Sequence, residues 1–143
     1  MPSNSKTAET LQQVLVDSYA TLIATHRFHW NVETGNFYAW HKLAEDIYTE
    51  QFAAVDEIAE RIRALDKKPD LSPEVLAKTT TIKAGDDSAS LLAAQEAMVA
   101  ILKKLEDVAD DEDDSVTQDL ANARMAQHEK NIWMIKTQIK AGK

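Results

Sequence analysis

Five side chains in one stretch of the sequence combine imidazole and carboxylate groups at spacings that suit a metal ion. His41 and Glu45 are four residues apart, and Asp56 and Glu60 repeat that spacing further along. His29 precedes His41 by twelve residues. On a helix, residues i and i+4 lie one turn apart on the same face, so each pair could chelate an ion. Imidazole nitrogen and carboxylate oxygen together suit iron, manganese or zinc.

The two pairs are too far apart for one chain to close a single site. Asp56 follows His41 by 15 residues, which is about 22 Å along a continuous helix. The same 15 steps return to within roughly 60° of the starting direction, so both pairs face one side. If two copies of the helix cross antiparallel about a two-fold axis near residues 50 and 51, the first pair of one copy lies opposite the second pair of the other. Such a dimer would carry two identical sites.

Each pair also has a simpler interpretation as part of a solvated helix surface. Taken alone, the first pair would be ordinary neighbours on an exposed face. The second pair lies next to Arg61 and Arg63, which could hold it in a salt-bridge network. Because all five positions are in register, we favour metal binding.

Apolar residues recur at three- and four-residue spacing in four long segments, which predicts four amphipathic helices. Only three Gly and three Pro occur in 143 residues, which supports a mostly helical chain. A short helix over residues 73–78, with Ser72 as its N-cap, is expected in the longest connection. A capping box beginning at Ser115 is expected to open the last helix. The long helices are predicted at residues 7–32, 37–66, 88–110 and 115–140.

This order of elements predicts an all-α fold, a ferritin-like four-helix bundle with a short helix in its long middle crossover. The short first connection makes the first two helices antiparallel neighbours, which brings His29 near His41. On the last helix, Ala123 is expected to face the core, and His128 is given no role. We expect a single domain over residues 1–143, with residues 1–6 as a short flexible tail.

Composition and charge narrow the classes of function. The absence of cysteine excludes disulfides and thiolate metal sites. A net charge of −8 argues against a general attraction to DNA or to anionic lipid. The N-terminus has no apolar signal segment, and no apolar run approaches the roughly 20 residues that span a bilayer. We therefore expect a cytoplasmic protein with no membrane partner.

Four sequence motifs carry a resemblance to a known family. They are HWNV (29–32), GNFYAWH (35–41), DEIAER (56–61) and HEKNIWMIK (128–136), and together they resemble the Dps family of miniferritins. The resemblance implies a homo-oligomer, a hollow dodecamer with ferroxidase centres at its two-fold interfaces. There Fe(II) is oxidised, preferably by hydrogen peroxide, and Fe(III) is stored as a mineral, which protects against oxidative stress.

Carried over residue by residue, the resemblance gives His29, His41 and Glu45 as metal ligands from one subunit, and Asp56 and Glu60 from its two-fold mate. Position 45 is Glu where the family more often has Asp, which puts the geometry of the second metal position in doubt. The implied metal is iron, as a di-iron centre, with zinc or manganese as substitutes. Few protein ligands per ion would leave positions open for peroxide.

Three further residues receive roles from the same resemblance. Trp30, next to His29, could intercept a stray oxidising equivalent, although tryptophan is by default a core or interface residue. Asp114 and Asp119 lie in or near an acidic run that is ordinarily a solvated loop. In a closed shell they could line a pore through which iron enters.

Two other functions stay open at this point. One is a DNA-binding, nucleoid-compacting protein, but the N-terminal tail has a single lysine and the C-terminus offers only Lys136, Lys140 and Lys143. Neutralising several phosphates needs more positive charge than this, so DNA is an unlikely partner. The other is a metal-storage cage without redox turnover. Oxidation of Fe(II) by peroxide, compared in native and ligand-deficient protein, separates that cage from a ferroxidase.

Overall fold

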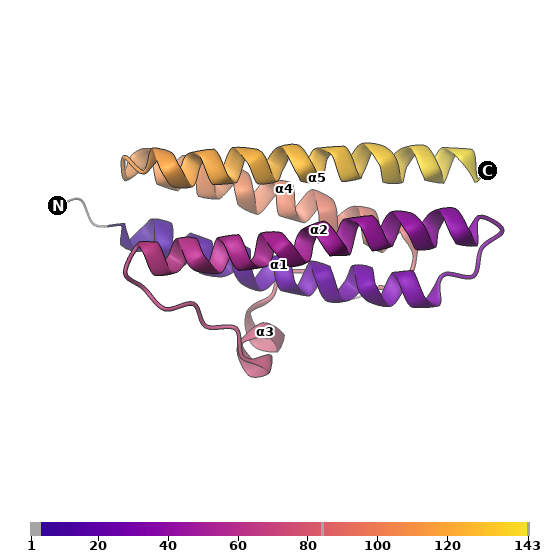
Figure 1. Ribbon diagram of the computed structural model, residues 1–143, viewed down its shortest axis with the longest axis horizontal. Helices are drawn as coiled ribbons and strands as arrows, with labels where there is room; N and C mark the ends of the chain where they lie inside the picture. The colour runs from indigo at the N-terminus through magenta and orange to yellow at the C-terminus, as the bar shows by residue number, and fades with distance from the viewer. Residues whose placement is uncertain (1–3, 84, 143) are drawn as a thin grey trace.

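The computed structural model describes residues 4–83 and 85–142, and these residues form five helices and no strand. Four long helices make the bundle, and a short fifth helix lies in the crossover between the second and the third long helix (Figure 1). This confirms the predicted all-α, ferritin-like architecture. The helices are α1 (Ser5–Asn31), α2 (Phe37–Ala64), α3 (Pro73–Thr79), α4 (Ser88–Asp111) and α5 (Ser115–Ala141).

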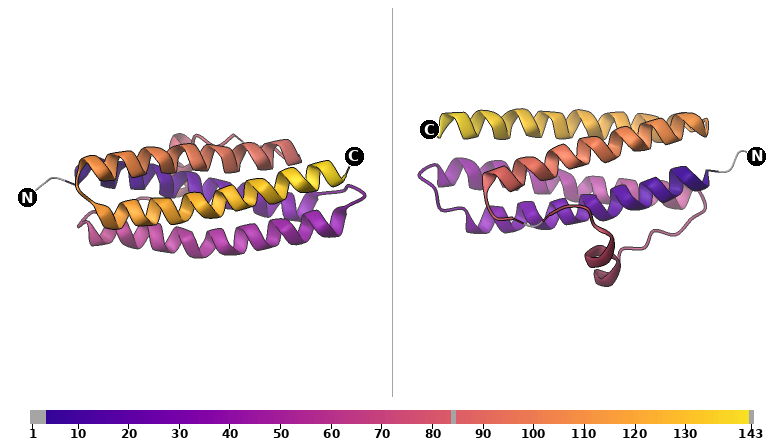
Figure 2. Two further views of the ribbon diagram at one scale, coloured as in Figure 1. Left: turned by 90° about the horizontal axis from the view of Figure 1, so that it is seen from above. Right: turned by 180° about the vertical axis from the view of Figure 1, so that it is seen from behind.

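The bundle has two layers, α1 with α2 and α4 with α5, and α3 lies on the side of the first layer that is remote from α5 (Figures 1 and 2). Residues 32–36 connect α1 to α2, so the two helices run antiparallel side by side, as predicted. Of the predicted flexible tail, residues 1–3 lie outside the described residues. Ser5 and Lys6 already belong to α1.

Side-chain caps begin three of the helices. The hydroxyl of Ser72 accepts a hydrogen bond from the Val75 amide at 3.2 Å, ahead of Pro73 at the first helical position. Asp87 caps α4 in the same way. The predicted cap of α5 is wrong by one residue, because Asp114 rather than Ser115 accepts from the Thr117 amide, at 3.0 Å. Aspartate is as good an N-cap as serine, so the acidic residue before the expected box takes that position.

The interior has two apolar clusters separated by a polar layer. One cluster includes Leu15, Ile58 and Leu102, and the other includes Phe28 and Ile135. Their members come from separate stretches of all four long helices. Between these stretches, each long helix contributes buried polar side chains: Ser18, Thr21 and Thr25 from α1, Gln51 from α2, Gln95 from α4, and Arg124, His128 and Asn131 from α5.

Arg124 and His128 organise this polar layer, and sequence reasoning missed both. The guanidinium of Arg124 forms an ion pair with Glu50 and donates to Gln51 at 2.9 Å. His128 donates from Nδ1 to Gln95 at 2.6 Å. Burial, and then the charge of Arg124, lower the pKa of His128 to about 3, so the imidazole is neutral. The polar layer therefore holds α2 to α5 and α4 to α5 by hydrogen bonds instead of apolar contact.

The polar layer also explains why one core prediction is wrong. Ala123 is exposed, and Arg124 points into the bundle in its place. The inward face of α5 follows positions three and four residues apart, and its middle positions are polar. A search for apolar residues at helical spacing cannot recognise such positions. The buried residues of α5 are Thr117, Leu120, Ala121, Arg124, His128, Asn131 and Ile135.

Candidate metal centre

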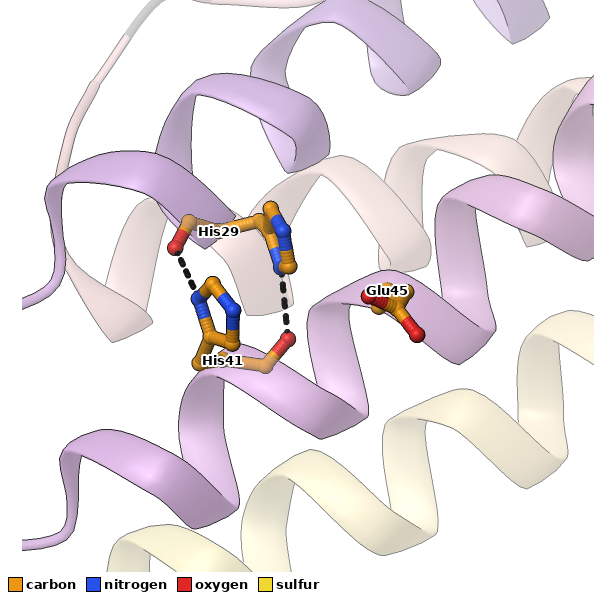
Figure 3. A group of neighbouring side chains, drawn as sticks. All are labelled: His29, His41 and Glu45. Atoms are coloured by element: carbon orange, nitrogen blue, oxygen red, sulfur yellow. Dashed lines mark hydrogen bonds between the residues drawn. The ribbon is translucent and has the colours of Figure 1, made fainter.

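Two histidines from neighbouring helices hold each other in place by reciprocal hydrogen bonds. His29 lies in the last turn of α1 and His41 lies near the start of α2, on either side of the short connection. Nδ1 of His29 donates to the backbone carbonyl of His41 at 2.7 Å, and Nδ1 of His41 donates to the carbonyl of His29 at 2.7 Å (Figure 3). The two rings stack with centroids 3.7 Å apart and planes 18° apart.

These hydrogen bonds decide which nitrogen of each ring can bind a metal. A carbonyl oxygen only accepts, so both Nδ1 atoms carry hydrogen, and the lone pair of each neutral ring lies on Nε2. A hydrogen bond from the non-ligating nitrogen to a carbonyl is how metal-binding histidines are usually oriented. The Nε2 atoms of His29 and His41 are therefore preorganised as ligands.

Glu45 completes a group of three potential ligands with the two histidines. One ligand atom from each of His29, His41 and Glu45 lies within 4.8 Å of the others. Lys42 contacts the Glu45 carboxylate at 3.1 Å and also contacts Asp46 at 3.1 Å. The hydrogen bond and charge of Lys42 lower the pKa of Glu45, so this carboxylate is ionised at neutral pH. We call His29, His41 and Glu45 the imidazole half-site.

The other two predicted ligands lie on the same helix but do not join this group. Asp56 and Glu60 are exposed on α2, which is continuous from Phe37 to Ala64. The helix rise therefore separates Asp56 from His41 by about 22 Å. We call Asp56 and Glu60 the carboxylate half-site. The chain thus brings three of the five predicted ligands together and leaves two apart, which is the separation that the spacing predicts.

The salt-bridge alternative for the carboxylate half-site finds no support among the described residues. Arg61 donates to Thr117 at 3.0 Å and pairs with Asp114 at 2.9 Å, across to α5. Arg63 donates to the backbone carbonyl of Lys67 at 2.7 Å. Both nearby guanidinium groups are therefore engaged elsewhere.

Aromatic rings extend from the imidazole half-site to the surface. Tyr48 meets the ring of His29 edge-on with centroids 5.2 Å apart, and it lies 4.4 Å from the ring of His26. His26 in turn lies 3.8 Å from Trp30, which is 60% exposed. Sequence reasoning did not single out Tyr48. Its position seven residues after His41, on the same helical face, was the available signal.

The two acidic residues predicted at a pore have different surroundings. Asp119 is exposed, whereas Asp114 is buried and accepts from both the amide and the hydroxyl of Thr117. Burial alone would raise the pKa of Asp114, but the hydrogen bonds from Thr117 and the charge of Arg61 hold it below its usual value. Asp114 thus has a structural role in this chain, and the pore stays a prediction. Within the described residues, no helix is long and apolar enough to cross a membrane.

The sequence and the fold of this chain are both similar to those of known proteins. The profile of the ferritin-like domain family matches residues 8–143. A DNA protection during starvation protein from Helicobacter pylori is 32% identical over 143 residues, which covers 94% of this chain and 99% of the relative. The crystal structure of a Dps protein from Bacillus brevis superimposes with a TM-score of 0.91 at 27% identity, covering 97% of this chain and 98% of that one. A Dps protein from Vibrio cholerae O1, a member of a broad superfamily of ferritin-like diiron-carboxylate proteins, gives a TM-score of 0.90 at 25% identity, covering 96% of this chain and 91% of that one.

Proposed function

Because this chain belongs to the Dps family of ferritin-like proteins, we propose that it is a miniferritin that oxidises Fe(II) and stores the Fe(III) product as a mineral. Hydrogen peroxide is the preferred oxidant, and oxidation takes place at a centre shared by two subunits. The subunits assemble into a dodecameric shell in the cytoplasm, with the mineral inside. Removing both iron and peroxide in one reaction protects the cell against oxidative damage.

The imidazole half-site is the observation that supports this proposal most strongly. Two imidazoles whose Nδ1 atoms donate to carbonyls, which leaves Nε2 as the ligand atom, and one ionised carboxylate lie within reach of one ion. The carboxylate half-site lies on the same helix at a distance that only a second subunit can bridge. In an antiparallel two-fold pair, the partner's Asp56 and the partner's Glu60 complete the ligand set. Each dimer then has two equivalent centres.

Iron is the substrate at this centre, and zinc or manganese could take its place, zinc without any redox chemistry. Imidazole nitrogen holds Fe(II), while the carboxylates stabilise the more highly charged Fe(III) product. Two Fe(II) ions each give one electron to one hydrogen peroxide molecule. The O–O bond breaks, and with two protons the peroxide oxygens leave as two water molecules. Pairing the two electrons in this way avoids release of a hydroxyl radical.

Trp30 and the acidic residues near the start of α5 complete the proposal. Trp30 gives up an electron when an oxidising equivalent is left over at the centre, and the ring contacts through Tyr48 and His26 offer a route.

Asp119, with its exposed carboxylate, and Asp114 lie near the pore through which Fe(II) enters. Because the carboxylate of Asp114 pairs with Arg61, Asp119 is the stronger candidate of the two.

Stopped-flow oxidation of Fe(II) by peroxide tests the proposed function. We expect native protein to react faster than His41→Ala and faster than Asp56→Ala by about a hundredfold or more, because each variant loses a ligand of the same centre. Equal rates in the three proteins would contradict a ferroxidase and leave the non-redox storage cage as the better description. A low-salt gel-shift assay checks the expected absence of DNA binding, which the net charge of −8 disfavours.

A further inference from the structure

One exposed aromatic ring lies between the two half-sites on the outer face of α2. Phe52 is 65% exposed, and it shares a face with His41 and Glu60 at three- and four-residue spacing. An aromatic side chain of this size, left in water on a polar stripe, is typical of a contact surface. The whole stripe consists of His41, Glu45, Thr49, Phe52, Asp56 and Glu60.

A groove opens beside Phe52, between α2, α1 and the segment that leads toward α3. Its volume is ≈ 500 Å³, and Asp56 is the one charged side chain among its lining residues. An apolar cavity of about 150 Å³ is enough to hold benzene, so this groove has room for a phenyl ring. The apolar or small side chains that line it are Leu15, Phe52, Ala53, Val55, Ala59, Pro69 and Leu71.

We propose that the occupant of this groove is Phe52 of a second copy of the chain, and that the two rings anchor the two-fold pair. The proposal rests on the two-fold centre of the proposed function, and it names the contact that brings the two half-sites together. The anchor sets the register of the two α2 helices. In that register Phe52 lies opposite the partner's Thr49, and Asp56 lies opposite the partner's Glu45.

Helix geometry directs the ring toward the groove. With the axis between residues 50 and 51, the two copies of Phe52 are offset by three residues, or about 4.5 Å along the helices. A long side chain on a helix leans toward its own N-terminus. In an antiparallel pair this direction points to the C-terminal half of the partner's α2, where Ala53 and Asp56 line the groove. The small side chain of Ala53 lets the two helices approach closely at this point.

Complementary ligand sets favour a second copy over an unrelated apolar partner. On one side of Phe52 the stripe carries His41 and Glu45, and on the other side it carries the carboxyls of Asp56 and Glu60. An antiparallel copy places the partner's Glu60 against His41 and the partner's Asp56 against Glu45, and a metal ion held between the facing carboxylates offsets their repulsion. The stripe with its bound ion is therefore complementary to itself, as a two-fold interface requires.

Disulfide trapping measures this geometry, because the chain has no cysteine of its own. Thr49 is exposed on the stripe, and its two copies are offset by the same distance as those of Phe52. With helix axes 8–10 Å apart, the two Cα atoms would be separated by about 6 Å, which a disulfide can span. We expect Thr49→Cys to form disulfide-linked dimers under mild oxidation. Glu57→Cys, exposed on another face of α2, is the matched control and should stay monomeric on a non-reducing gel.

A second substitution in the Thr49→Cys protein tests the anchor itself. Phe52→Ser should lower the initial rate of disulfide formation by about tenfold or more. Without the phenyl ring, pairing no longer buries an apolar side chain, so the dimer is less stable. Phe52→Leu, which keeps an apolar side chain, should retain most of the rate. Trp133→Ser removes an aromatic residue of similar exposure from α5 and should leave the rate unchanged. Circular dichroism should be the same for all variants, since both rings are largely exposed.

The outcomes separate the anchor from the proposed function. If Thr49→Cys forms dimers and Phe52→Ser does not slow them, the anchor is wrong while the two-fold pairing stands. If Glu57→Cys cross-links and Thr49→Cys does not, α2 pairs through another face, and both the anchor and the shared centre are wrong. If cross-linking follows the prediction but Fe(II) oxidation matches that of His41→Ala, the anchor stands and the ferroxidase function falls.

Discussion

The two half-sites differ in how much of their geometry the chain itself supplies. In the imidazole half-site, His29 is 6% exposed, and both histidine rings are held by hydrogen bonds to backbone carbonyls. In the carboxylate half-site, Asp56 and Glu60 are exposed and no neighbouring arginine holds them. In the proposed centre, one half-site is therefore oriented before assembly, and the other obtains its geometry from a partner.

This difference indicates an order of events. A half-site with two oriented imidazoles would hold an ion by itself, although weakly, because a carbonyl engages each Nδ1 and leaves Nε2 as the donor atom of a fixed ring. Two flexible carboxylates on an exposed helix face gain little from binding an ion alone, since they must first lose side-chain freedom. In the proposed two-fold pair, assembly would raise the affinity of the first half-site by adding the ligands of the second.

Zinc binding by two single variants tests the difference between the half-sites most strongly. Zinc has no redox chemistry, so its binding reports ligand geometry alone. We expect His41→Ala to weaken zinc binding by about a hundredfold or more, and Asp56→Ala by about tenfold or less. Isothermal titration calorimetry measures both. Equal losses would show that the two half-sites contribute alike, and that the imidazoles are not preorganised.

Acid should lower the free energy of unfolding of the bundle, and both half-sites depend on that bundle for their geometry. The pKa of His128 is about 3 in the folded chain, below the ordinary value of 6.5, so between these values the unfolded chain binds more protons. Stability should therefore fall as the pH falls below 6.5, by up to about 1.4 kcal/mol per pH unit from this group.

Urea denaturation at several pH values measures this loss. His128→Gln, which can still donate to Gln95 but does not titrate, should give a shallower dependence on pH. An unchanged slope in that variant would mean that His128 does not govern the acid response.

The smallest expected effect concerns Lys42, which forms an ion pair with the Glu45 carboxylate. The contact is exposed, with side-chain accessibilities of 51% and 41%, so solvent screens it and its contribution is small. Lys42→Met should strengthen zinc binding at neutral pH by no more than about fivefold, because a metal ion no longer competes with the ammonium group. The matched variant Lys103→Met on α4 removes a pair of the same spacing, with Glu106 three residues on, and should have no effect. Weaker binding in Lys42→Met would show that the lysine positions Glu45 instead of competing for it.

The fold and the grouping of the ligands could be predicted from the sequence because they depend on periodicity. Helical spacing located the four long helices, the start signal at Ser72 and Pro73 located α3, and the short connection after α1 placed His29 near His41. The reciprocal hydrogen bonds between the two rings were out of reach, since they depend on how α1 and α2 are rotated about their axes. Spacing along a chain does not determine that rotation.

The polar layer and the cap of α5 show where such reasoning fails. Arg124 and His128 look like surface residues because charged and polar side chains are rarely buried without partners. Their partners, Glu50, Gln51 and Gln95, come from other helices, so only the assembled bundle reveals that they are satisfied. Asp114 was assigned to a pore by resemblance. Its contacts with Arg61 and Thr117 depend on packing between α2 and α5.

Complementation between two inactive variants tests the shared centre most directly. His41→Ala and Asp56→Ala are co-expressed with different tags, and mixed assemblies are isolated. In a mixed two-fold pair, one centre combines both defects and the other is intact. Random pairing therefore restores roughly a quarter of the native centres. We predict that the mixed assemblies regain about that fraction of the Fe(II) oxidation rate, whereas a rate no higher than that of either variant alone would contradict a centre built from two subunits.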